Sequence, residues 1–258
     1  MYQVDAFSSE PFKGNPAAVC VLEKWPDDVT MQSIAAENNL AETAFILETE
    51  NGYDLRWFTP EVEIDLCGHA TLASAYIVFK FLQPELKSIA FSTMSGELVV
   101  EASDDGRLSM DFPSRAPEQI KISAEAKQAF GDAALEAWQS RDLLVLLESE
   151  TAVREFQPDM AALSNIKDSF AVIITALGDE VDFVSRFFAP NAGIPEDPVT
   201  GSAHCTLIPF WAERLNKQTL HAHQLSKRTG ELFCENSGER VRMSGYASLF
   251  LKGEIYLA

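Results

Sequence analysis

The chain has 258 residues, 47% of them hydrophobic and 23% charged, a composition typical of a globular protein that buries a full core. Its 39 acidic and 20 basic side chains give a formal net charge of −19, and no Lys/Arg-rich run occurs, which argues against nucleic-acid binding. The start "MYQVDAFSSEPFKGNPAAVC" lacks the pattern of a signal peptide, and no apolar run reaches the ~18 residues of a membrane helix. Four widely spaced cysteines favour a reducing compartment, so we expect a soluble cytoplasmic protein without a membrane partner.

The first half of the chain alternates strand patterns with two helical segments. Residues 26–40 carry acidic side chains at their start and spaced apolar residues, which predicts a helix. The segment "GHATLASAYIVFKFL" (68–82) is small and apolar almost all round, which predicts a helix buried in a core. Strands are expected at 1–7, 17–22, 43–48 and 53–60, with a β-meander over 89–113.

The second half follows the same order of elements. Strands are expected at 143–149, 170–177 and 182–190, a helix at 158–166, and a second small-apolar segment at 202–215, before strand-like stretches to the end. Residues 114–120 read as a connection. We therefore predict lobes 1–115 and 116–258, with the alternative that the last strand joins the first lobe.

An internal repeat supports this division. "RWFTPEVEIDLCGHATLASA" (56–75) aligns without gaps on "RFFAPNAGIPEDPVTGSAHC" (186–205), because 186 − 56 = 130, and Cys67 then falls opposite Asp197. Chance identities are the alternative explanation, but the shared element order favours a true repeat. The repeat predicts an α+β molecule of two pseudo-symmetric lobes, each aiming a helix N-terminus at a cleft between them, where small molecules often bind.

The helix starts in "LCGHATLASA" and "EDPVTGSAHC" are suited to binding an anion. Helix N-termini expose unpaired N–H groups and the positive end of the helix dipole, and Gly68 and Gly201 let a ligand approach the backbone. We expect a substrate carboxylate there. The alternative is that the small residues only allow a central helix to pack tightly.

Several nearby side chains are candidates for chemistry, each with a structural alternative. Asp197 precedes Pro198, so helix capping is an adequate explanation for it taken alone. His69 suits proton transfer or is a neutral core histidine, and Cys67 is a stabilised thiolate or a small buried hydrophobe. Glu42 lies between buried segments, as a general acid or base often does, although a solvated loop charge is the commoner case.

Other motifs are absent or weak. Asn15 in "KGNPAA" is explained by turn formation. His221 and His223 form an H-x-H motif, but no Cys, His or acidic partner follows at metal-site spacing, so we expect a surface pair and no metal. The sequence contains no P-loop, no G-x-G-x-x-G and no G-x-S-x-G, so we expect no cofactor.

The chain resembles the phenazine-biosynthesis PhzF-like isomerase family over nearly its whole length. The resemblance rests on "DAFSSEPFKGNPAAVC", "NNLAETAFI", "WFTPEVEIDLCGHATLASA" and "FFAPNAGIPEDPVTGSAH", while "HQLSKRTGEL" is similar to a late Gln…Gly-Arg segment in which Lys227 stands where glycine is usual. The family resembles diaminopimelate epimerase in fold, which implies two lobes, each a barrel-like β-sheet wrapped round a central helix. Homodimers are common in it.

The resemblance also implies roles for individual residues. The acid/base glutamate maps to Glu42, the supporting histidine to His69, the aspartate to Asp197 and the serine to Ser202. Asn15, Cys67, Gly68 and Gly201 are then expected to bind substrate. The expected function is a cofactor-independent isomerase that moves a proton on a small carboxylate-bearing molecule. The alternatives are an epimerase or racemase that uses Cys67, and a non-catalytic small-molecule-binding protein.

Overall fold

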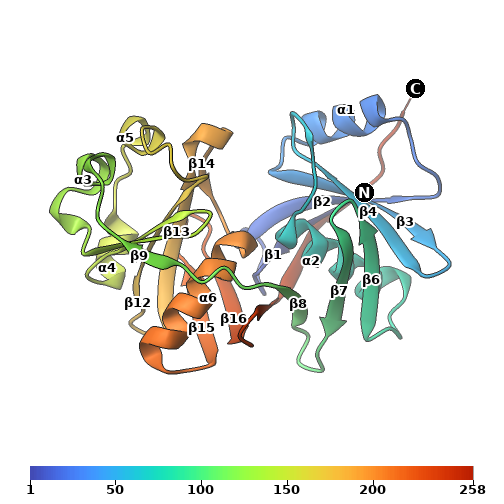
Figure 1. Cartoon of the computed structure of the whole chain (residues 1–258). Coiled ribbons are helices and arrows are strands. Elements are labelled where there is room, and N and C mark those ends of the chain that lie inside the picture. Colours follow the sequence, from blue (N-terminus) through green and yellow to red (C-terminus); the bar gives the residue numbers. More distant parts are fainter. Residues whose placement is uncertain (258) are drawn as a thin grey trace. The chain divides into compact units, whose positions relative to one another are not determined.

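Two units of the chain each carry a sheet and a buried helix. The computed structural model describes residues 1–257 and divides into unit 1, Met1–Asp111 with Ser244–Ala258, and unit 2, Phe112–Met243 (Figure 1). The expected lobes were 1–115 and 116–258. The final segment lies in unit 1, because its strand pairs antiparallel with the first strand of the chain. No helix within the described residues is long and apolar enough to cross a membrane.

The strands and helices of unit 1 follow the predicted order. They are β1 (Tyr2–Ala6), β2 (Asn15–Leu22), α1 (Asp28–Asn38), β3 (Glu42–Thr49), β4 (Gly52–Phe58), β5 (Glu63–Ile64), α2 (Gly68–Ile77), the π-helical turn η1 (Val78–Leu82), β6 (Ser88–Thr93), β7 (Gly96–Ala102), β8 (Leu108–Pro113) and β18 (Ala247–Lys252). The Asp27 side chain caps α1 by accepting a hydrogen bond from the Thr30 amide, and Asn39 ends that helix in the left-handed conformation.

The sheet of unit 1 runs in the order β18–β1–β2–β3–β4–β6–β7–β8. Its β2/β3 and β4/β6 pairs are parallel and the other pairs are antiparallel. Helix α2 packs against β1, β2, β3 and β18. All of its residues except Gly68 and Tyr76 are buried, as the apolar pattern of 68–82 predicted. The first turn of α2 is therefore held against the strands that begin at Asn15 and Glu42.

Unit 2 contains more short helices than the sequence predicted. Its elements are β9 (Glu118–Ile120), α3 (Ala124–Phe130), η2 (Gly131–Ala133), β10 (Glu136–Gln139), β11 (Leu143–Leu146), α4 (Glu150–Glu155), α5 (Met160–Ser164), β12 (Val172–Leu177), β13 (Phe183–Ala189), η3 (Pro190–Ala192), β14 (Ile194–Asp197), α6 (Gly201–Leu215), β15 (Thr219–Gln224), β16 (Gly230–Asn236) and β17 (Arg240–Gly245). Helices α3 and α4 were missed because each is only one or two turns long. Serine side chains cap both.

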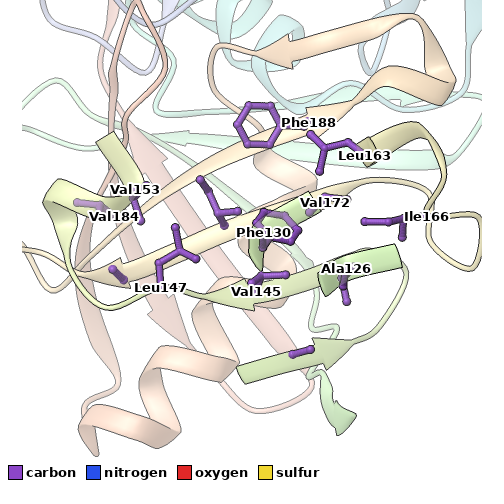
Figure 2. Packing of buried hydrophobic residues seen from close by; sticks show 14 of the residues in the cluster. Ala126, Phe130, Val145, Leu147, Val153, Leu163, Ile166, Val172, Val184 and Phe188 are labelled. Atoms are coloured by element: carbon purple, nitrogen blue, oxygen red, sulfur yellow. The ribbon is translucent and has the colours of Figure 1, made fainter. Parts of the chain in front are cut away.

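The sheet of unit 2 runs in the order β9–β10–β11–β12–β13–β15–β16. Its β11/β12 and β13/β15 pairs are parallel, and the remaining pairs are antiparallel. Figure 2 shows part of its core, where Phe130 of α3, Val153 of α4 and Leu163 of α5 pack on side chains of β11, β12 and β13. The short helices thus cover an apolar sheet face that strands alone would leave in water.

Strand pairing bears out the internal repeat at the level of topology. In each unit, a parallel pair (β2/β3; β11/β12) is followed by an antiparallel pair (β3/β4; β12/β13) and a second parallel pair (β4/β6; β13/β15). A buried helix, α2 or α6, lies in the chain between the strands of that second parallel pair. Strand–turn–helix units are common, but their frequency alone does not explain why both halves have the same order of strand pairings.

The ungapped register of the repeat is wrong after the proline turn. Helix α2 starts at Gly68 and α6 at Gly201, an offset of 133 (201 − 68) instead of 130. Two arginine–glutamate pairs show the same change, since Arg56 contacts Glu63 at 2.6 Å and Arg186 contacts Glu196 at 2.7 Å. The arginines are 130 residues apart (186 − 56), whereas the glutamates are 133 apart (196 − 63). Three extra residues in the second turn account for the change.

This offset changes the partner of Cys67. Cys67 is the N-cap residue of α2, and the N-cap residue of α6 is Thr200. Asp197 instead corresponds to Ile64, because each pairs with an aromatic residue of the preceding strand, Phe187 and Trp57 respectively. The prediction that Asp197 occupies the position equivalent to Cys67 is therefore wrong.

Candidate functional site

Four predicted site residues meet in unit 1. Asn15 begins β2, Glu42 begins β3, Cys67 is the N-cap residue of α2 and His69 lies in its first turn. All four are less than a tenth exposed, although asparagine, glutamate and histidine are commonly found at protein surfaces. Burying these polar side chains costs free energy unless they interact with one another.

The parallel pairing of β2 and β3 brings Asn15 near Glu42. Ala17 pairs with Glu42, so Asn15 lies only two residues before that level on the neighbouring strand. Helix α2 then places its first turn across the same two strands. At that turn the Cys67 carbonyl accepts hydrogen bonds from both the amide and the hydroxyl of Thr71, at 3.2 and 2.6 Å, which stabilise the first turn.

His69 is the centre of this cluster. Its Nε2 lies 3.1 Å from Oε2 of Glu42, while its Nδ1 lies 3.3 Å from Nδ2 of Asn15 and 3.5 Å from Sγ of Cys67. The Nε2–Oε2 distance is that of an ion pair, but the two atoms do not meet hydrogen-bond directionality. The Glu42 carboxylate is therefore close to His69 but shares no well-aligned hydrogen bond with it.

The contacts of Nδ1 indicate which protons His69 carries. With the Asn15 amide donating from Nδ2, Nδ1 is an acceptor and the ring proton lies on Nε2, next to Glu42. Burial, the largest influence, lowers the pKa of His69, whereas the Glu42 carboxylate, and Cys67 whenever it is ionised, raise this pKa well above its usual value. Protonation of Nδ1 requires the Asn15 amide to turn and present its oxygen. Asn15 is thus placed to control how His69 takes up a proton.

Cys67 is poorly suited to act as a base. Burial is the largest cause that raises the pKa of its thiol, and the nearby Glu42 carboxylate raises it further. Smaller contributions from His69 and from the Ala70 amide act in the opposite direction. The neutral thiol is therefore the stable form at neutral pH, although a helix start usually favours a thiolate.

A second group of predicted site residues lies in unit 2, where Asp197 ends β14. The Thr200 hydroxyl donates a hydrogen bond to Oδ2 of Asp197. Helix capping, the structural alternative for Asp197, does not describe it, because the N-cap residue of α6 is Thr200 and the Asp197 carboxylate contacts the Thr200 side chain. Pro198 consequently lies in the loop before α6 and not at its first helical position.

Gln224, which the sequence did not single out, holds this loop. Its amide is fully buried; Nε2 donates to the Asp197 carbonyl at 2.8 Å, and Oε1 accepts from the Thr200 backbone amide at 2.8 Å. Ser226 adds a 2.8 Å hydrogen bond to the Pro198 carbonyl. The Gln…Gly-Arg resemblance around residue 224 was the only sequence signal of this contribution.

Ser202 lies one residue into α6, beside Arg141. The guanidinium donates to Oγ of Ser202 at 3.0 Å and pairs with both carboxylate oxygens of Asp142 at 3.0 and 2.8 Å. It also lies 4.7 Å from the centre of the Phe170 ring. Arg141 is a second residue that sequence reasoning missed, because nothing in residues 140–143 indicates a contact with residue 202.

His204, also in α6, makes unit 2 sensitive to acid. It is fully buried, its Nδ1 lies 2.8 Å from the Thr200 carbonyl, and burial lowers its pKa to about 4 although that hydrogen bond raises it. A histidine in the unfolded chain takes up a proton near pH 6.5, so stability is fully present above that pH and falls by about 1.4 kcal/mol per pH unit between there and about pH 4.

We expect replacement of His204 by asparagine to reduce this acid sensitivity. Asparagine keeps an N–H donor near the position of Nδ1 but does not titrate. Between pH 7 and pH 5, the free energy of unfolding of the native protein should fall by about 2 kcal/mol more than that of His204→Asn. Urea unfolding at each pH measures the difference. A pH dependence of His204→Asn equal to that of the native protein would contradict the assignment.

Two sets of donor atoms within the described residues are close enough to share a metal ion. One is Glu42, Cys67 and His69 in unit 1; the other is His221, His223 and Glu231 in unit 2. In the first set the neutral Cys67 thiol would have to lose its proton before it could act as a ligand. Glu231 is the acidic partner of the H-x-H motif that the sequence analysis did not find.

Comparison with known proteins gives matches over the full chain. The family model described as phenazine biosynthesis-like protein, PhzC-PhzF, matches residues 4–253. A Pseudomonas aeruginosa protein with the name uncharacterized isomerase is 51% identical over 258 residues, covering all of this chain and 98% of the relative. A crystal structure of a phenazine biosynthesis protein of the PhzF family from Enterococcus faecalis is 51% identical, with a TM-score of 0.97 and coverage of 99% and 98%.

More distant structures share the fold alone. A probable proline racemase from Agrobacterium radiobacter is only 8% identical, yet matches with a TM-score of 0.63 over all of this chain and 92% of its own. These similarities confirm the α+β, epimerase-like fold that the sequence predicted, and they confirm the resemblance on which that prediction rested.

Proposed function

Since the chain belongs to the phenazine biosynthesis-like PhzC-PhzF family, we propose that it is a cofactor-independent isomerase that moves a proton on a small carboxylate-bearing substrate. The observation that carries the proposal is the buried contact between Glu42 and His69, at 3.1 Å. An acid/base pair shielded from water is what a proton shift between carbon atoms requires.

In the proposed reaction, Glu42 removes a proton from a substrate carbon and returns it to another carbon. His69 lies beside this carboxylate, with its Nε2 3.1 Å from Oε2 of Glu42. Asn15 contacts Nδ1 of His69 and thereby keeps the Nε2 proton on the side of Glu42. Since the proton returns from the same carboxyl group, the reaction needs no external acid and no redox partner.

Binding of the substrate carboxylate is proposed for the helix starts. Helices α2 and α6 begin at Gly68 and Gly201, and the first turn of a helix presents backbone amides of the kind that bind anions. Asp197 and Ser202 are proposed as supporting groups for binding and proton movement. This proposal is supported by hydrogen bonds that hold both residues in place. Gln224 holds the loop that contains Asp197, and Arg141 donates to the Ser202 hydroxyl.

The raised pKa of Cys67 supports Glu42 over the thiol as the base. We expect Cys67→Ser to retain turnover within about tenfold, because serine keeps a small polar group next to His69 and general acid/base loss costs far more. Steady-state turnover on a confirmed substrate measures this. Loss of deuterium exchange at an α-carbon in Cys67→Ser alone would instead identify an epimerase or racemase that depends on the thiol.

The experiment that tests the proposal is NMR in deuterium oxide with a panel of small unsaturated and amino carboxylates. Deuterium incorporation or double-bond migration that needs the protein supports an isomerase. Ligands that bind, by chemical-shift change, and are never altered across the panel would contradict it and identify a small-molecule-binding protein.

Three further predictions accompany this proposal. We expect a homodimer, because dimers are common in the family that the sequence resembles, and native mass spectrometry measures the mass of the assembly.

We expect a cytoplasmic location, which fractionation of the source cells tests. We also expect activity to persist after dialysis against a chelator, as cofactor-independent proton transfer requires.

A further inference from the structure

Three donor side chains gather on the β15–β16 hairpin of unit 2, and none of them has a part in the proposed reaction. We propose that His221, His223 and Glu231 bind one divalent transition-metal ion, with Zn²⁺ as the expected species. The donor atoms of all three lie within 4.8 Å of one another. Two imidazoles and a carboxylate are ligands that zinc commonly takes, and water completes the coordination of such three-residue sites.

Strand geometry explains why the three residues converge. His221 and His223 are two residues apart in β15, so both side chains project from the same face of the strand. Antiparallel pairing with β16 places Glu231 directly opposite His223 and Phe233 opposite His221. The carboxylate is thus a cross-strand neighbour of one histidine and a diagonal neighbour of the other.

The distances are close to those of a metal site, although Nε2 of His221 and Oε1 of Glu231 share a hydrogen bond that a metal ion would replace. Oε1 of Glu231 lies 2.9 Å from Nε2 of His221 and 3.9 Å from Nε2 of His223. Ligand atoms about 2.0–2.1 Å from a tetrahedral zinc ion are about 3.4 Å apart, a value between these two distances. Small side-chain rotations therefore suffice, and one oxygen already faces both ring nitrogens.

The first imidazole is already held in position. The His221 ring stacks on Phe233, with centroids 4.7 Å apart and planes at 6°. Its backbone amide donates to Oδ2 of Asp182 at 2.7 Å, which holds the strand next to the loop before β13. Metal binding would therefore restrict the His221 side chain only a little further, and such preorganisation favours tight binding.

The charge around the site favours a cation. The neighbouring basic groups are already paired, Arg154 with Glu150 and Lys217 with Asp182. The formal net charge of the whole chain is −19, which attracts divalent ions to the surface in general. The three ligands are about one-third exposed, so an ion reaches them from solvent without opening of the fold.

The test is Zn²⁺ binding by isothermal titration calorimetry on full-length protein without a histidine tag, after chelator treatment. We expect one ion per chain with a Kd below about 10 µM, and at least a tenfold weaker Kd in His223→Gln, because loss of even an outer-shell partner costs zinc sites about that factor. Glu231→Gln provides a second variant if the first misfolds by circular dichroism. Bound Co²⁺ should show a ligand-field spectrum without a thiolate charge-transfer band.

Cys67→Ser is the matched control, because Glu42, Cys67 and His69 are the other donor set. Its zinc stoichiometry and Kd should equal those of the native protein. Unchanged binding in both His223→Gln and Glu231→Gln, loss of binding in Cys67→Ser, or no binding at 100-fold excess zinc would each overturn the proposal. None of these outcomes depends on the isomerase activity, so the two proposals fail separately.

Discussion

Replacement of Glu42 by glutamine should lower turnover by about 10²- to 10⁴-fold, the range that a general acid/base usually contributes. Glutamine has nearly the shape of glutamate but cannot accept a substrate proton. The position is nearly buried beside His69, so water has little access to replace the lost base. Deuterium incorporation into a confirmed substrate, followed by NMR, measures the effect on the proton-transfer step itself.

Two further readouts separate catalysis from folding in Glu42→Gln. The pKa of His69 should fall, because Glu42 is one of the groups that raise it, and histidine ring NMR signals report that change. The exposed residue Glu50, in the turn after β3, offers a matched control, and Glu50→Gln should keep native turnover. Native turnover in a folded Glu42→Gln protein would remove Glu42 from the mechanism.

Replacement of Trp211 by alanine should lower the free energy of unfolding by about 3–5 kcal/mol, as expected for a large aromatic residue removed from a core. Trp211 in α6 is 1% exposed, and its ring stacks on Phe183 of β13 at 5.8 Å. Its Nε1 donates to Oγ1 of Thr175 in β12 at 2.9 Å. Alanine leaves a cavity and also removes the hydrogen-bond donor to a buried hydroxyl.

Urea unfolding followed by circular dichroism measures this loss, with separate transitions fitted if the two units unfold independently. Trp211→Phe should cost less, because an aromatic ring remains and only part of the volume and the Nε1 donor are lost. Tyr256 is 87% exposed, and Tyr256→Ala should change stability by less than about 0.5 kcal/mol. A loss below about 1 kcal/mol in Trp211→Ala would show that α6 contributes little to the core.

Some predictions depended only on local patterns and were accurate for that reason. A helix without a polar face has to be buried wherever the rest of the chain lies, and α2 is buried over nearly its full length. The acidic residues at the start of the predicted helix 26–40 also act within one turn, and Asp27 is the N-cap residue of α1. Strand alternation likewise depends on residues two apart, so β4 was predicted close to its observed bounds.

Predictions that needed pairing between distant segments were less accurate. The ungapped repeat placed Cys67 opposite Asp197, because an alignment without gaps does not detect three extra residues in a turn. Only strand pairing and the helix starts show that Thr200 is the residue equivalent to Cys67. The same limit explains why Gln224, 24 residues beyond Thr200, was not recognised as its partner.

The sequence by itself determined the family, the fold class, the order of elements and the residue types available for chemistry, because composition, periodicity and motifs are local properties of a chain. Tertiary structure decided which of those residues touch. It placed Glu42, Cys67 and Asn15 around the two nitrogens of His69, and it brought Glu231 to His221 and His223 across a strand pair. Such contacts depend on strand register and helix position. Many weak interactions over the whole fold set these together, so no short stretch of sequence determines them.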